Sequence, residues 1–121
     1  MGKVLVIEDE RNISMVLQEA LGMEGHEVLI AHDGLAGLKL LNEGFQPDLA
    51  LLDLNMPGMN GRDFVMKVCE DVRNFSIILL TGSAPNPQEF PPAGSYQSVI
   101  TKPFDLIKLI DTVNHFVDLE C

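Results

Sequence analysis

Residues 49–58 read LALLDLNMPG, and this stretch indicates the fold because a continuous apolar run ends abruptly on the carboxylate of Asp53. A strand that is apolar on both faces is typical of a parallel sheet with helices on either side. Four apolar runs end in this way on polar residues: residues 4–7 before Glu8 and Asp9, 49–52 before Asp53, 77–80 before Thr81, and 99–100 shortly before Lys102. If these strands are parallel, their carboxyl ends lie at one edge of the sheet, where open α/β folds carry their sites.

Helical periodicity separates the apolar runs, and residues 27–31 form one more strand-like segment. Four sets of apolar residues recur at helical spacing: Ile13, Val16, Leu17, Ala20 and Leu21; Leu35, Leu38 and Leu41; Val65, Val68, Cys69 and Val72; and Leu106, Leu109, Ile110, Val113 and Val117. We expect helix starts at Asp33, Asn60 and Asp105, and helix ends at Gly22 or Gly25 and at Gly44. Alternating strands and helices predict one α/β domain, residues 1–121, with a doubly wound, five-stranded parallel sheet flanked by helices.

The composition narrows the classes of function. Eighteen acidic and eight basic residues give a net charge of −10, which disfavours direct binding to nucleic acid. No apolar stretch approaches the roughly 18 residues of a membrane span, and no signal-peptide pattern precedes the first strand. We therefore expect a cytoplasmic protein without direct membrane contact.

Neither the cysteines nor the histidines form a recognisable site in the sequence. Cys69 and Cys121 lack the spacing of a metal or redox motif. His26, His32 and His115 share no spacing with one another, and we interpret them as surface or turn residues.

One segment departs from the alternation. Pro85, Pro87, Pro91 and Pro92 lie between the fourth and fifth strands. Each proline inside a helix costs roughly 3 kcal/mol, so a regular helix is disfavoured there. We expect an extended or turn-rich crossover in place of a fourth helix.

The strand-end residues suggest a phosphoryl-transfer site. Converging carboxylates at Glu8, Asp9 and Asp53 repel one another unless a cation lies between them, and hard oxygen ligands suit Mg²⁺. An aspartate can act as a nucleophile toward phosphorus, while a lysine and a hydroxyl, here Lys102 and Thr81, can bind phosphoryl oxygens. Considered singly, Asp53 could be a turn residue and the Glu8-Asp9 pair a helix cap.

These motifs, taken in order, resemble the receiver domain of response regulators (CheY-like), the phosphoacceptor half of two-component signalling. The resemblance spans the chain from Val4 to the last helix. It rests on the Glu8-Asp9 pair, DLNMPGMNG from Asp53, Thr81, and Lys102-Pro103-Phe104. It implies the sheet order 2-1-3-4-5.

The resemblance also implies roles for individual residues. Asp53 would be the phosphorylated aspartate, with Lys102 and Thr81 binding the phosphoryl group. Mg²⁺ would be held by Glu8, Asp9, Asp53 and the backbone carbonyl of Asn55, and the Lys102-Pro103 peptide would be cis. The phosphoryl donor would be a sensor histidine kinase or a histidine phosphotransfer protein, and the output an unidentified downstream protein partner or effector domain. The domain would not be an enzyme beyond catalysing its own phosphorylation and slow dephosphorylation.

Two departures from the family pattern leave alternatives open. Val99 stands where the family usually has an aromatic residue, Tyr96 is a poor substitute for it, and residues 85–92 replace the fourth helix. These features motivate an alternative, a receiver-like interaction domain that does not switch. A small phosphatase with an aspartyl-phosphate intermediate is a weaker alternative, because Asn55 stands where such enzymes commonly place a second aspartate.

Overall fold

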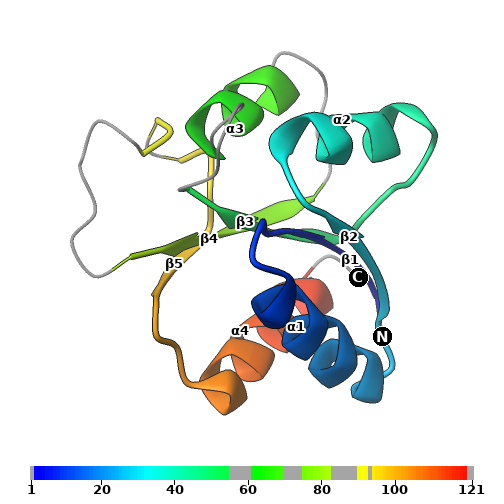
Figure 1. Cartoon of the computed structure of the whole chain (residues 1–121), viewed down its shortest axis with the longest axis vertical. Coiled ribbons are helices and arrows are strands. Elements are labelled where there is room, and N and C mark those ends of the chain that lie inside the picture. The colour runs from blue at the N-terminus through cyan, green and yellow to red at the C-terminus, as the bar shows by residue number, and fades with distance from the viewer. Residues whose placement is uncertain (1, 55–60, 70–74, 83–89, 93, 120–121) are drawn as a thin grey trace.

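The computed structural model describes residues 2–54, 61–69, 75–82, 90–92 and 94–119. These residues contain five strands and four helices, arranged in three layers (Figure 1). The strands are β1 (Lys3–Ile7), β2 (Glu27–Ala31), β3 (Leu49–Asp53), β4 (Ser76–Thr81) and β5 (Ser98–Thr101). The helices are α1 (Arg11–Met23), α2 (Gly34–Asn42), α3 (Gly61–Cys69) and α4 (Leu106–Leu119). In the described part of the chain, no helix is both long and apolar enough to span a bilayer.

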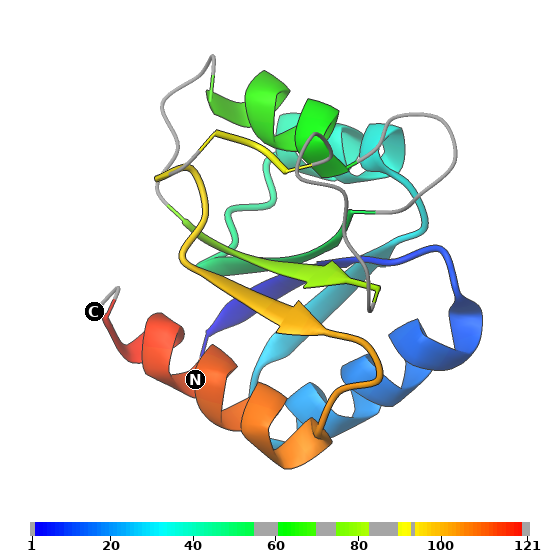
Figure 2. The same ribbon diagram turned by 90° about the vertical axis from the view of Figure 1, so that its left-hand side faces the viewer.

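The five strands form one parallel sheet in the order β2-β1-β3-β4-β5. This arrangement confirms the predicted doubly wound sheet and the strand order that the resemblance implied. Figure 2 shows the strand arrows pointing in a common direction, so all five carboxyl ends lie along one edge of the sheet. We call this the carboxyl edge, and the opposite one the amino edge.

Each face of the sheet carries its own apolar core. Helices α2 and α3 cover one face and α1 and α4 the other (Figure 1). Along β3, Ala50 and Leu52 pack toward α2 and α3, whereas Leu49 and Leu51 pack toward α1 and α4. All residues of β3 and β4 are buried, which explains why these strands are apolar without alternation.

The helix boundaries follow from local capping. Asp33 caps α2 by accepting a hydrogen bond from the amide of Ala36 at 2.7 Å, as predicted. The carboxylate of Asp105 accepts a bond from the Ile107 amide at 2.9 Å at the start of α4. Gly25 follows α1 with φ of 91°, a conformation that favours glycine, so the turn after α1 depends on Gly25 rather than Gly22.

The described part of the crossover between β4 and β5 contains turns and no helix, as the prolines predicted. The rings of Phe90 and Tyr96 meet edge to face with centroids 6.1 Å apart and pack against the α2–α3 core. Gln97 holds the crossover to β4, because its side-chain oxygen accepts the Ile77 amide at 2.6 Å. Tyr96 therefore lies before β5 begins and packs on the core. Residues 83–89, with Pro85 and Pro87, lie outside the described residues.

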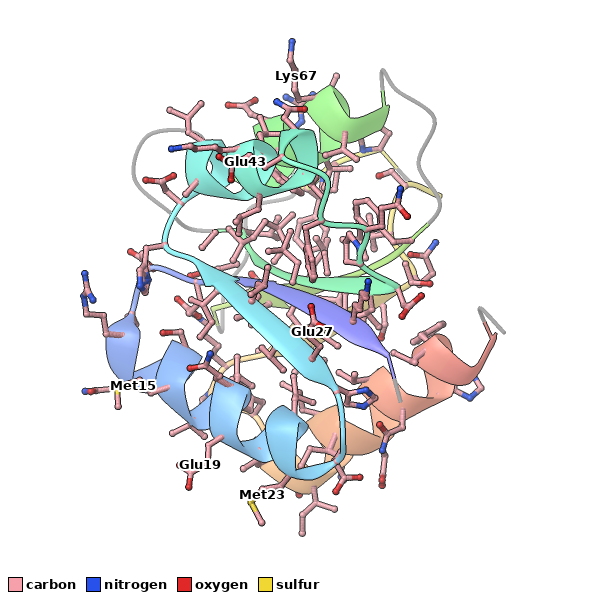
Figure 3. The ribbon with its side chains drawn as sticks, turned by 90° about the vertical axis from the view of Figure 1, so that its right-hand side faces the viewer. Met15, Glu19, Met23, Glu27, Glu43 and Lys67 are labelled. Atoms are coloured by element: carbon pink, nitrogen blue, oxygen red, sulfur yellow. The ribbon has the colours of Figure 1, made fainter. Side chains whose placement is uncertain are left out.

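Two apolar residues from the helical patterns do not face the core. Val16 is 48% exposed on α1 and Leu35 is 62% exposed on α2. The outer row of α1 also carries Met15, Glu19 and Met23, whose side chains point away from the sheet (Figure 3). The buried faces of α1 and α2 are therefore narrower than the periodicity predicted, whereas the predicted residues of α4 all pack in the core.

Candidate phosphoacceptor site

Backbone hydrogen bonds align the polar residues at the carboxyl edge. They run from the Glu8 amide to the Ala31 carbonyl at 3.0 Å, from Leu54 to Leu80 at 2.9 Å, and from Lys102 to Thr81 at 2.7 Å. Each bond joins a residue at a strand end to the neighbouring strand. The side chains that leave the sheet at this edge are therefore brought together by the strand pairing itself.

Three carboxylates converge there. One carboxylate oxygen each from Glu8, Asp9 and Asp53 lies within 4.8 Å of the other two. Glu8 is fully buried and Asp53 is only 3% exposed, whereas Asp9 is half-buried and borders solvent. The structure thus brings together three residues predicted to bind the metal ion.

Lys102 reaches the same cluster from the end of β5. Its ammonium lies 2.7 Å from Glu8 Oε1 and 3.1 Å from Asp53 Oδ2, so it donates to both carboxylates. The Lys102–Pro103 peptide bond is cis, as expected from the resemblance. In the described part of the cluster, the ammonium of Lys102 therefore faces two buried carboxylates.

Burial and mutual repulsion shift the ionisation of this cluster. Burial is the largest cause that raises the pKa of Glu8 from 4.5 to about 7; Lys102 opposes it and Asp53 adds to it. Burial would lower the pKa of Lys102, but its contacts with Glu8 and Asp53 outweigh burial and raise that pKa above its usual value. One ammonium does not fully offset the cost of burying the Glu8 carboxylate next to Asp53.

Thr81 ends β4 beside the cluster, and the strand register pairs its predecessor, Leu80, with Asp53. Thr81 is 1% exposed, and its hydroxyl oxygen has no hydrogen-bond partner among the described residues. A buried hydroxyl without a partner costs free energy, so this group is available for a ligand that reaches the site.

The donor set fits a hard divalent cation. It consists of carboxylate oxygens from Glu8, Asp9 and Asp53, without imidazole or thiolate, and one of its members borders solvent. Mg²⁺ typically takes a small number of carboxylates and keeps several waters. Asn55, whose carbonyl was expected to contribute, lies outside the described residues.

One histidine, His26, differs from the interpretation based on sequence, whereas His32 lies in the bend between β2 and α2 as expected. His26 is a buried residue, 7% exposed, and not a surface one, whereas His115 is exposed as expected. His32 is half-buried, with Nδ1 3.4 Å from the Glu8 carbonyl oxygen at the rim of the site. No spacing motif marks these positions. His26 contacts Gly2 and His32 contacts Glu8, and in each case the two residues are 24 positions apart in the sequence.

Comparison with known proteins agrees with this geometry. The profile described as response regulator receiver domain matches residues 4–114. Sporulation initiation phosphotransferase F of Bacillus subtilis (strain 168) is 32% identical over 122 residues, which cover 98% of this chain and 95% of that protein. A CheY-like receiver domain protein from Methanospirillum hungatei JF-1 superposes with a TM-score of 0.85 at 27% identity, over 98% of this chain and 95% of that one.

The chain belongs to the response regulator receiver domain family. Some relatives are longer: the transcriptional regulatory protein CpxR of Escherichia coli (strain K12) is 41% identical over 81 residues, which are 67% of this chain and 34% of that protein. The match thus covers about a third of the CpxR relatives. The resemblance inferred from the motifs is confirmed.

Proposed function

We propose that this chain is a phosphoacceptor in a two-component phosphorelay, and that Asp53 receives a phosphoryl group from a phosphohistidine. The donor would be a sensor histidine kinase or a histidine phosphotransfer protein in the cytoplasm. The phosphorylated form would change its binding to a downstream partner or effector domain. The domain would catalyse only its own phosphorylation and its own slow dephosphorylation.

The observation that carries the proposal is the placement of Lys102 and three carboxylates around one point at the carboxyl edge. Lys102 Nζ lies 3.1 Å from Asp53 Oδ2, close enough to donate to a phosphoryl group carried on that residue. A cluster of this composition combines a nucleophile with groups that neutralise charge, and phosphoryl transfer needs both.

In the reaction we propose, a carboxylate oxygen of Asp53 attacks the phosphorus. The bond between phosphorus and the donor imidazole nitrogen breaks, and its electron pair returns to the imidazole. Lys102 would shift from the carboxylates to the phosphoryl oxygens, and the Thr81 hydroxyl, which lacks a partner among the described residues, would donate to another of them.

Glu8, Asp9 and Asp53 would hold a Mg²⁺ ion. When bound, this ion would supply positive charge to the crowded carboxylates and to the phosphoryl oxygens. Glu8 and Asp9 would hold the ion, while Asp53 also serves as the nucleophile.

The test is the intact mass of the protein after incubation with acetyl phosphate and Mg²⁺. We expect one phosphoryl adduct that is absent with EDTA and absent from Asp53→Asn. Asp111→Asn, which changes an exposed aspartate on α4, is the matched control and should gain the adduct like the unaltered protein. An adduct of equal yield on Asp53→Asn would contradict the proposal.

A second function, a receiver-like interaction domain that does not switch, is favoured by Val99. This residue of β5 pairs with Leu79 of β4, is 38% exposed, and has no aromatic ring that could follow Thr81. Such a domain would bind its partner equally well with and without beryllium fluoride, an analogue of the phosphoryl group. A several-fold change in affinity would instead support the phosphoacceptor.

A further inference from the structure

A buried histidine lies at the amino edge of the sheet, at the opposite end from the carboxylate cluster. His26 follows α1 and directly precedes β2. Its Nδ1 accepts a hydrogen bond from the Gly2 amide at 3.0 Å, and its Nε2 lies 2.6 Å from the Oδ1 atom of Asn114 in α4. The imidazole therefore joins the start of β1 to the C-terminal helix.

The hydrogen-bond partners define the protonation state that this arrangement requires. A backbone amide can only donate, so Nδ1 must be without a proton. The Asn114 side-chain amide donates from Nδ2 to Glu24 Oε1 at 3.1 Å, which orients its oxygen toward the ring. Nε2 therefore carries the proton, and all these bonds exist together only when the imidazole of His26 is neutral.

Gly2 is closely packed against α4 and against the residue before β3. A Cβ atom at Gly2 would lie 2.6 Å from Val117 Cγ1 in α4 and 2.9 Å from Asp48 Oδ2. The Gly2 carbonyl also accepts the Glu27 amide at 2.9 Å. Residue 2 is thus fixed between β2, α4 and the residue before β3, and its amide is held by His26.

Charged groups surround this network on each neighbouring element. Glu24, which follows α1, contacts Asn114, and Asp48, which precedes β3, accepts the Lys3 amide at 2.8 Å. Among the described residues, Lys3 in β1, Glu27 in β2 and the exposed His115 in α4 are charged or titratable neighbours in sequence of this network. The Gly2 amide is incompatible with a proton on Nδ1, because two donors would then face each other.

We propose that His26 is a proton-sensitive latch that holds α4 against the start of β1. A second proton on the ring turns Nδ1 from an acceptor into a donor and breaks the bond to Gly2. The bond to Asn114 persists and becomes charge-assisted. The start of β1 then loosens relative to α4, so a partner bound to α4 would sense acidification independently of Asp53.

The test is an NMR titration of the unphosphorylated chain from pH 8 to 5. It follows the ring nitrogens of His26, the Gly2 amide and the amides of α4. We expect an Nε2–H tautomer at pH 8, and Gly2 and α4 signals that shift with the same midpoint as the ring. Hydrogen exchange at Gly2 should rise across that midpoint.

Three variants make the test specific. Glutamine offers an acceptor and a donor but does not titrate, so His26→Gln should abolish the transition, whereas His115→Gln, at the exposed neighbour of Asn114, should leave it unchanged. Asn114→Asp places a carboxylate on the ring and should move the midpoint to higher pH by roughly one unit.

The proposal is overturned if the Gly2 amide does not respond while the ring titrates, or if the transition persists in His26→Gln. It is also overturned if the ring stays neutral until the chain unfolds. If His26→Gln does not fold, Asn114→Asp decides alone: a midpoint that stays in place or falls contradicts the latch.

Discussion

Replacing Glu8 by glutamine should stabilise the metal-free protein at neutral and alkaline pH, although it removes one side of an ion pair. Glu8 is fully buried, and its pKa rises from 4.5 to about 7 on folding. The folded protein therefore binds the Glu8 proton more tightly than the unfolded chain does. The free energy of unfolding therefore falls as the pH rises from 4.5 to about 7. Above about pH 7, Glu8 is ionised in the folded protein, and the full cost of burying its charge lowers the stability.

The expected size follows from the two pKa values. A shift from 4.5 to about 7 corresponds to about 3 kcal/mol between the two ionisation states. Lys102 donates to Glu8 Oε1 and the Glu10 amide to Glu8 Oε2, so glutamine, with a single oxygen, keeps only one of these two hydrogen bonds. That loss costs about 1 kcal/mol and does not vary with pH. The unfolding free energy of Glu8→Gln relative to the unaltered protein should therefore rise by about 2–3 kcal/mol between pH 5 and pH 8, with a net gain at pH 8.

The assay is urea unfolding of both proteins at pH 5, 6, 7 and 8 with EDTA present. Glu19→Gln is the matched control, because Glu19 lies exposed on the outer row of α1 (Figure 3) and should change stability by less than about 0.5 kcal/mol. Mg²⁺ should reduce the gain, since the glutamine is a poorer ligand. A Glu8→Gln protein that is less stable at pH 8, or a gain that does not vary with pH, would show that the Lys102 pair outweighs burial.

The remaining predictions concern stability in urea unfolding. Gly37→Ala should destabilise by roughly 1–3 kcal/mol, because its Cβ would lie 2.7 Å from Ile7 Cδ1 in the buried core. The matched Gly22→Ala meets nothing within 4 Å and should stabilise α1 by roughly 0.5–1 kcal/mol; equal effects of the two would refute the packing explanation. Asp33→Ala removes the cap of α2 and should cost about 1 kcal/mol, whereas no loss would show that the cap is dispensable. Lys102→Met should cost roughly 1–3 kcal/mol at pH 8 and less at pH 5, where Glu8 is protonated; a loss that does not vary with pH would count against the charge argument.

The strands could be predicted because burial on both faces of the sheet produces uninterrupted apolar runs, whereas their order came from the resemblance to the receiver domain family. Asp53 and Thr81 stand out because each ends such a run. The helices were placed correctly, but the predicted buried faces of α1 and α2 were too wide. Val16 and Leu35 fit the helical spacing and are nevertheless exposed. The spacing shows which side of a helix is apolar, but not how far the neighbouring elements cover that side.

The contacts that set the energetics were not predictable, because they depend on distance in space and not in sequence. The 2.7 Å contact between Lys102 and Glu8 joins residues 94 positions apart, and its length depends on how a flexible lysine side chain packs. The bond from His26 to Asn114 spans 88 positions and has no motif. A single sequence records the residue types at each position but not these pairings.

The buried titratable groups at the two edges of the sheet differ in how well their hydrogen-bond and charge partners stabilise them. At the amino edge, His26 has partners for both ring nitrogens when neutral. At the carboxyl edge, Glu8 is buried beside Asp53 with one shared ammonium, and its raised pKa records an unfavourable ionised state. A glutamine at position 8 would remove the buried charge, although it would accept from only one of the two donors that Glu8 contacts. Side chains whose pKa is strongly shifted at a cost in stability are typical of functional sites. The raised pKa of Glu8 therefore favours a role in cation binding at this edge over a purely structural role.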